Sequence, residues 1–242
     1  MDPTTTSGNG PDHLPAAAAL TAVAALSDEL RRQMYGFIRR ARRPVSREEA
    51  AENVGISRKL AAFHLDKLVE VGLLRAHYEP ADGIRKVGRA PKLYEPTDAG
   101  VQISIPSREH ELLADILVDA LLTEDGGKTG HDAALHVARL RGVELGAAEF
   151  ERARPGRLGA ERALTLATAA LSRYGFEPER ATPTLLRLRN CPFHPLAGKA
   201  PQLICGINHA FLTGFLEALQ ASTVTAVLAP RVGECCIELT AD

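Results

Sequence analysis

The apolar positions in the first half of the chain recur with the period of amphipathic helices. Residues 15–25 are apolar and rich in alanine, which predicts a short packed helix. Leu30, Met34 and Ile38 then follow one another at helical spacing, and Ser27 precedes them as a candidate N-cap. The pattern therefore predicts two successive helices.

Two further helices are predicted around a tight turn. Ser46, followed three residues later by Glu49, forms the capping-box signature of a helix that ends at Gly55. Ser57 then caps the next helix. Two helices joined by a short turn that contains glycine are typical of a helix-turn-helix.

A hairpin is predicted to follow these helices. Residues 73–77 and 92–95 have the composition of strands, and residues 80–88 have that of a turn. A helix-turn-helix followed by a hairpin is a winged helix. We therefore predict a flexible tail over residues 1–15, which are rich in Thr, Gly and Pro, and a winged helix-turn-helix domain over 16–103.

The second half of the chain mixes helical and strand patterns. Two amphipathic helices are predicted between residues 107 and 142, within a helical linker or dimerisation region at 104–145. The remaining predicted elements are helices at 158–174 and 201–219 and strands at 184–189, 223–228 and 234–239. The predicted fold class is α+β, with an α+β sensor domain at 146–242.

Charge separates the two halves more clearly than composition does. The 242 residues carry a net charge of -1, but residues 31–95 hold 15 Lys or Arg against 8 Asp or Glu. A local positive field favours binding to the phosphate backbone of nucleic acid. The start of the chain has no basic signal-peptide region, and the apolar stretch at 14–26 is too short to span a bilayer. We therefore expect a cytoplasmic protein with no membrane partner.

The helix that begins after Ser57 has a polar face that could enter a DNA groove, whereas its apolar stripe around Leu65 faces the core. Ser57 and the helix N-terminus can hold a phosphate, and Arg58 or Lys59 can reach guanine. Phe63 can touch a thymine methyl group. The alternative is a solvated basic helix. The predicted DNA contacts are Ser57, Arg58, Lys59, Ala62, Phe63 and Lys67 on the helix and Arg85, Lys86, Arg89 and Lys92 on the hairpin.

The segment GRAPKLYEPTDAG, at 88–100, resembles the wing-closing signature of bacterial winged-helix regulators of the ArsR and MarR kind. The resemblance covers about residues 27–101. It implies a winged helix that binds a double-stranded DNA operator.

All four cysteines lie in the last 52 residues. In a reducing cytosol, clustered cysteines are metal ligands or redox-active thiols more often than disulfides. The spacing Cys191-x13-Cys205-x29-Cys235 lacks the short CxxC knuckle of most structural zinc sites, so zinc is the second choice. Thiolates also select copper and iron-sulfur clusters. Adjacent strand positions face opposite ways, so we expect only Cys235 or Cys236 to point into a shared site.

The segments LLRLRNCPFHPLAGKAPQLICGINHAFLTGFLEAL and GECCIEL resemble the sensor domain of the SufR-type iron-sulfur repressors. This likeness extends along nearly the whole chain from about residue 27. It implies a homodimeric winged-helix repressor that binds an inverted-repeat operator. It also implies an iron-sulfur cluster held by Cys191, Cys205 and Cys235, with Cys236 as the alternative third ligand. The adjacent pair Cys235 and Cys236 and the slightly longer interval before the third ligand depart from the family pattern. His194 or His209 could be the fourth ligand of the cluster.

The same residues are also compatible with two other sensors and with one other class of protein. A disulfide between Cys205 and Cys235 or Cys236 would make a thiol switch, and an apolar pocket could bind a small metabolite. Cys191 and His194 could form a nucleophile pair, but no third orienting group accompanies them. The sequence therefore predicts a regulator and not an enzyme.

Overall fold

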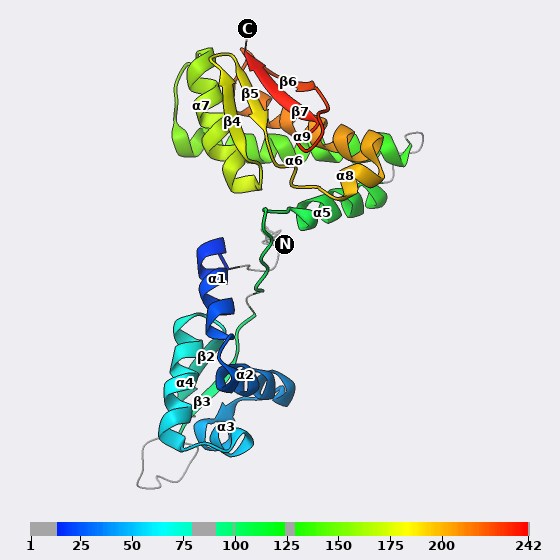
Figure 1. The fold of residues 1–242 in the computed structure, drawn as a ribbon. Coiled ribbons are helices and arrows are strands. Elements are labelled where there is room, and N and C mark those ends of the chain that lie inside the picture. The colour runs from blue at the N-terminus through cyan, green and yellow to red at the C-terminus, as the bar shows by residue number, and fades with distance from the viewer. Residues whose placement is uncertain (1–13, 79–90, 99, 124–128, 242) are drawn as a thin grey trace, which may run out of the picture. The chain divides into compact units, whose positions relative to one another are not determined.

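The computed structural model describes residues 14–78, 91–98, 100–123 and 129–241. Its internal contacts divide the chain into two compact units, 1–103 and 104–242 (Figure 1). Within the described residues, no helix is both long enough and apolar enough to cross a membrane.

Four helices build most of the first unit. They are α1 (Ala16–Ala25), α2 (Glu29–Ala41), α3 (Arg47–Val54) and α4 (Arg58–Glu70). The predicted cap of α2 was wrong by one residue, because the Asp28 side chain accepts the backbone N–H of Arg31 at 3.0 Å. The Ser27 hydroxyl instead donates to the carbonyl of Ala24 and so closes α1.

The predicted helix-turn-helix is confirmed in its local detail. Ser46 and Glu49 form both hydrogen bonds of the capping box at the start of α3. Gly55 ends α3 with a φ of 73°, a left-handed conformation that glycine adopts without steric strain. The Ser57 oxygen accepts the backbone N–H of Leu60 at 3.3 Å and so begins α4.

A small antiparallel sheet completes the first unit. Its strands are β1 (Val45–Ser46), β2 (Leu74–Tyr78) and β3 (Lys92–Pro96), in the order β1-β3-β2. The sequence did not predict β1, because two residues carry no periodic pattern. Met34, Ile38, Leu65 and Leu68 pack with Tyr94 in the core of this unit. The predicted turn at 80–88 lies outside the described residues.

The second unit is a four-stranded antiparallel sheet with helices packed against it. Its helices are α5 (His110–Leu122), α6 (Gly130–Ala153), α7 (Ala160–Leu171), the short 3₁₀ turn η1 (Ser172–Tyr174), α8 (Leu196–Lys199) and α9 (Pro201–Ala218). Its strands are β4 (Pro178–Thr182), β5 (Leu185–Leu188), β6 (Val224–Leu228) and β7 (Ile237–Ala241), in the order β4-β5-β7-β6. Helices α7 and α9 pack on the sheet, and α6 packs on α9 (Figure 1).

The α+β fold class is confirmed, but the boundary predicted between 145 and 146 falls inside α6. One hydrophobic core runs from Leu113 on α5 to Leu239 on β7. The segment 104–145 is therefore part of the α+β unit and not a separate linker. Helix α6 packs on α9, and α5 packs on α6, which periodicity alone does not reveal.

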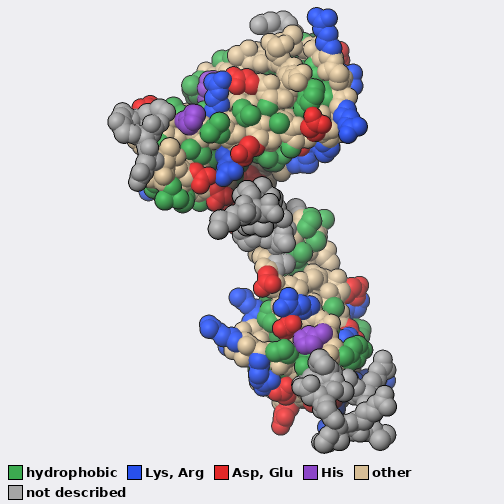
Figure 2. Space-filling model, turned by 180° about the vertical axis from the view of Figure 1, so that it is seen from behind, with side chains coloured by type: hydrophobic (Ala, Val, Ile, Leu, Met, Phe, Trp, Pro, Cys, Tyr) green, Lys and Arg blue, Asp and Glu red, His purple; other side chains and the backbone are tan. Residues whose placement is uncertain are grey.

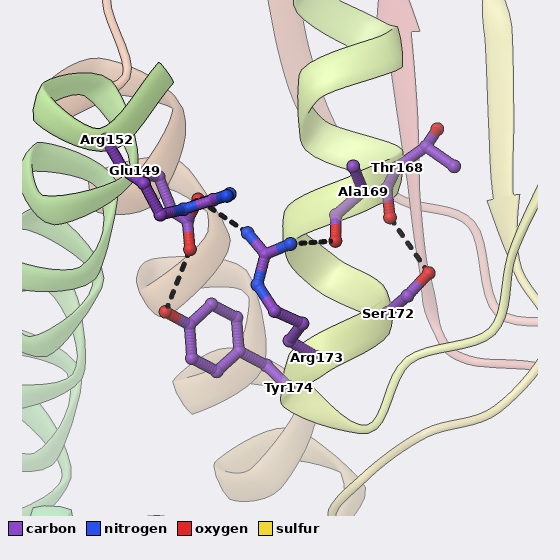
Figure 3. Close-up of polar contacts among 7 residues, drawn as sticks. All are labelled: Glu149, Arg152, Thr168, Ala169, Ser172, Arg173 and Tyr174. Atoms are coloured by element: carbon purple, nitrogen blue, oxygen red, sulfur yellow. Dashed lines mark hydrogen bonds and ion pairs between the residues drawn. The ribbon is translucent and has the colours of Figure 1, made fainter. Parts of the chain in front are cut away.

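A buried carboxylate joins the end of α6 to η1 (Figure 3). Glu149 is only 7% exposed, and the Arg173 guanidinium donates to its carboxylate at 2.5 Å. The Arg152 guanidinium pairs with the same carboxylate, and the Tyr174 hydroxyl donates to it at 3.4 Å. Burial opposes ionisation, but the hydrogen bonds from Arg173 and Arg152 outweigh it and lower the pKa of Glu149.

Replacing Glu149 with Gln should make the free energy of unfolding depend less on pH in the acidic range. A lowered pKa contributes stability that is present above the ordinary glutamate value of 4.5 and is lost as the pH falls through the folded value. At pH 7 we expect Glu149→Gln to lower the free energy of unfolding by about 2 kcal/mol, because charged hydrogen bonds are lost. Urea unfolding at several pH values measures this difference, which should shrink toward acid pH. A difference that stays constant would contradict the assignment.

Candidate DNA interface and thiol site

Helix α4 presents one buried face and one exposed face. Ala61, Leu65 and Leu68 are fully buried, as their helical spacing predicted. His64 is also buried, and its Nδ1 lies 4.0 Å from the Asp28 carboxylate. His64 therefore lies on the core side of α4, so it stays outside the candidate DNA contacts.

Two cations at the start of α4 are exposed. Arg58 and Lys59 form no ion pair with the residues that the structure describes. Phe63 is 54% exposed on the same helix, and Leu60 is 41% exposed. Sequence reasoning missed Leu60, although its place three residues before Phe63 puts both on one side of the helix. Ser57 begins this surface with its side-chain oxygen already bonded to Leu60.

The other predicted cations of this unit are paired or lie outside the described residues. The Lys67 ammonium lies 2.7 Å from the Glu70 carboxylate. Lys92 donates to Asp66 at 2.6 Å, and Tyr94 donates to the same carboxylate at 3.1 Å. The hydrogen bond to Asp66 raises the pKa of Lys92. These two cations are less available to DNA than Arg58 and Lys59, because an acidic neighbour partly neutralises each.

The pair of Lys92 and Asp66 lies in a groove between α4 and β3, which Arg47 and Ala62 also line. Ala62 is half-buried there. Further Lys and Arg side chains lie on the surface of the first unit (Figure 2). The predicted wing contacts Arg85, Lys86 and Arg89 lie outside the described residues.

The second unit brings the four cysteines together from three segments. Cys191 follows β5, Cys205 lies within α9, and Cys235 and Cys236 lie in the loop before β7. All four are free thiols, and all except the half-buried Cys205 are buried. The Cys191 thiol interacts with that of Cys235, and Cys236 interacts with both Cys235 and Cys205. The four thiols therefore lie near one another.

The cysteine doublet differs from the prediction. Strand β7 begins at Ile237, so Cys235 and Cys236 precede it, and the alternation of strand side chains does not apply to them. The backbone N–H of Cys235 donates to Leu188 at 2.9 Å, and the carbonyl of Cys236 accepts from Ala229 at 2.8 Å. Strand alternation therefore does not choose between Cys235 and Cys236, and the identity of the third ligand stays a prediction.

The surroundings of Cys191, Cys205 and Cys235 favour the protonated form of these thiols. The neighbouring Cys235 thiol and burial raise the pKa of Cys191 far above its usual range. The pKa of Cys235 is raised to about 12, because the Cys236 thiol and burial outweigh the opposing effect of Cys191. Thiolates in this site would therefore need a bound positive charge.

Asn208 is the residue of this site that sequence reasoning missed. It lies on α9 three residues after Cys205, is fully buried, and donates from Nδ2 to the Cys235 sulfur at 3.1 Å. The available signal was a single amide within the apolar stretch between Cys205 and Phe215.

The two candidate histidines are placed differently. His194 is exposed in the turn that begins at Cys191, and its ring makes no hydrogen bond to a described residue. The His209 ring hydrogen-bonds the carbonyl of Ala226 at 3.1 Å. No three His, Cys, Asp or Glu side chains in the described part of the chain are arranged to hold a single metal ion. A cluster distributes its thiolates over several irons, so its ligands need not converge on one point as those of a single metal ion do.

Comparison with known proteins identifies the first unit. Residues 26–77 match the model of a family described as a helix-turn-helix domain. The comparison with curated proteins gave no match. The chain therefore carries a helix-turn-helix domain, the module with which many transcriptional regulators bind DNA.

Proposed function

We propose that this protein is a transcriptional repressor whose affinity for its operator is controlled by an iron-sulfur cluster bound in the second unit. The matched helix-turn-helix domain supports DNA binding. Its exposed Arg58 and Lys59 supply the cations that phosphate and guanine contacts require. A homodimer on an inverted repeat suits this module, because each recognition helix reads one half-site.

The observation that carries the proposed sensor is the convergence of four free thiols from three segments. Iron-sulfur clusters are held by cysteine thiolates, and N–H donors to the sulfurs tune them. The site fits this need, because it offers four sulfurs and an amide donor from Asn208. The thiols are also mostly shielded from solvent, which protects a cluster from loss.

Cys191, Cys205 and Cys235 are the proposed ligands, and Cys236 is the alternative third ligand or a fourth. When bound, the cluster supplies redox and iron sensitivity. The chain's own part is to hold the thiols at the ends of β5 and β7 and on α9. Because α9 also packs on α6, a change in the position of Cys205 would reach the core of the unit. Coupling to DNA affinity requires that the two states bind the operator differently.

The test is a visible spectrum with iron and sulfide analysis on protein purified without oxygen. We expect a broad charge-transfer band at about 400 nm. Cys191→Ser, Cys205→Ser and Cys235→Ser should each lose most of the band. Cys236→Ser decides between three and four cysteine ligands. The variant keeps the band only if the Cys236 sulfur is not needed to hold the cluster. A colourless protein without iron would contradict the cluster proposal.

A thiol switch is the second candidate, and the contact between Cys205 and Cys236 favours it. Oxidation would form one S–S bond, with two protons and two electrons passing to an oxidant such as a peroxide. Reversible loss of two thiols per chain, together with changed DNA affinity and no iron, would support this function. Cys205→Ser would then abolish the response.

A further inference from the structure

Asn208 is a buried amide whose hydrogen-bonding capacity is only partly used. Its Nδ2 donates to the Cys235 sulfur at 3.1 Å, and its Oδ1 is buried without any donor among the described residues. Its neighbours on the buried face of α9 are Ile207, Phe211 and Leu212. An unsatisfied buried acceptor destabilises a fold, so packing alone does not explain an asparagine here.

Asn190 shows what a purely structural asparagine looks like in the same unit. Its Nδ2 donates to the carbonyls of Ser107 at 2.9 Å and Gly175 at 2.6 Å, and Arg108 donates to its Oδ1. Asn190 is therefore satisfied at both ends by groups that the fold must hold in place. Asn208 instead directs its one observed hydrogen bond to a thiol.

We propose that Asn208 is a positioning residue of the thiol site, which holds Cys235 in both its protonated and its ligating form. This inference rests on the proposed cluster. An amide suits both forms, because its N–H donates to a thiolate and its oxygen, after a half-turn of the amide, accepts a thiol proton. Leucine of similar volume can do neither, and an ionised aspartate can only accept.

The contact also distinguishes the two neighbouring cysteines. Asn208 bonds the sulfur of Cys235, and the backbone of Cys235 is fixed to the end of β5 at Leu188. Cys235 is therefore held by both α9 and β5, which favours it over Cys236 as the third ligand. Because hydrogen bonds to sulfur help to set cluster potentials, the amide should make the bound cluster easier to reduce and slower to leave.

The test compares Asn208→Leu and Asn208→Asp with the matched control Asn190→Leu. Each variant is purified without oxygen, and three quantities are measured: the cluster half-life in air, its reduction potential, and the thermal midpoint of the cluster-free protein. For Asn208→Leu we expect cluster loss about tenfold faster and a more negative potential. Its cluster-free midpoint should be unchanged or higher, because an unsatisfied polar group has been removed.

The control and the aspartate variant should behave differently. Asn190→Leu should lower the cluster-free midpoint, because the partners of Asn190 lose their hydrogen bonds. Asn208→Asp should shorten the cluster half-life at least as much as Asn208→Leu, since a carboxylate repels a thiolate. If Asn208→Leu lowers the cluster-free midpoint as Asn190→Leu does, and leaves half-life and potential unchanged, Asn208 is structural and the inference is overturned.

A wild-type protein without iron would defeat the proposed function and the part of this inference that concerns cluster ligation, but not the hold of Asn208 on the Cys235 thiol. Iodoacetamide labelling of the cluster-free protein then tests the positioning role. Peptide mass spectrometry measures the extent of labelling at Cys235 relative to that at Cys205 in the same chain. Asn208→Leu should increase the relative labelling of Cys235, because its sulfur is no longer held by the amide. An unchanged ratio would overturn the positioning role.

Discussion

Gly142→Ala is expected to lower the free energy of unfolding of the second unit by about 3 kcal/mol, or to prevent its folding. A Cβ at Gly142 on α6 would overlap the backbone carbonyl of Phe211 on α9. At the reciprocal position on α9, a Cβ at Gly214 would overlap the carbonyl of Arg139. Backbone atoms cannot rotate away as a side chain can, so the two helices would have to separate and lose their packed contact.

Urea unfolding followed by circular dichroism measures this effect. Gly130→Ala is the matched control, because Gly130 opens the same helix and a Cβ there meets nothing within 4 Å. We expect the control to change the free energy of unfolding by less than about 0.5 kcal/mol. If both variants unfolded at the same urea concentration, the close crossing of α6 and α9 would be wrong.

The double variant Arg58→Ala with Lys59→Ala is expected to bind operator DNA about 100-fold more weakly, since each base or phosphate contact contributes about 1–3 kcal/mol. Both side chains extend from the exposed start of α4, and neither forms an ion pair with a described residue, although Arg58 lies near enough to Glu48 to help lower the pKa of that carboxyl. Fluorescence anisotropy with a labelled operator measures the affinity. Repeating the measurement at several salt concentrations distinguishes phosphate contacts from base contacts. Loss of a phosphate contact makes the affinity depend less steeply on salt concentration, whereas loss of a base contact does not.

Lys67→Ala is the matched control on the same helix. Its ammonium already pairs with Glu70 at 2.7 Å, so its removal should weaken binding much less than Lys59→Ala does. If the double variant bound as tightly as the unchanged protein at moderate salt, α4 would not be the surface that contacts DNA. If Lys67→Ala and Lys59→Ala lowered the affinity for DNA equally, the ion pair with Glu70 would not prevent Lys67 from contacting DNA.

The helix-turn-helix was predictable because its signals are local. The capping box of Ser46 and Glu49, the left-handed Gly55 and the cap at Ser57 each act within a few residues. Side chains this close in sequence find one another whatever the rest of the chain does. The error at Ser27 was also local, since two adjacent residues could both act as caps and only one bonds the backbone of α2.

The thiol site was predictable only in part. Spacing and family resemblance named Cys191, Cys205 and the doublet, but the relation among their sulfurs depends on strands and a helix that are far apart in sequence. A three-residue shift in the start of β7 placed both Cys235 and Cys236 in a loop. Element ends are the least reliable part of any such prediction, and here they decide which sulfurs meet.

The sequence by itself determined the α+β class, the helix-turn-helix and the identity of the four thiols, because periodicity, caps and residue chemistry depend only on residues that are close together in the sequence. Only the tertiary structure decided that α6 crosses α9 at glycine, and that Asn208 lies against Cys235. It also joined the segment 104–145 to the core that carries the cysteines. These features depend on contacts between distant residues, whose close approach is set by the packing of the whole unit and by no single stretch of chain.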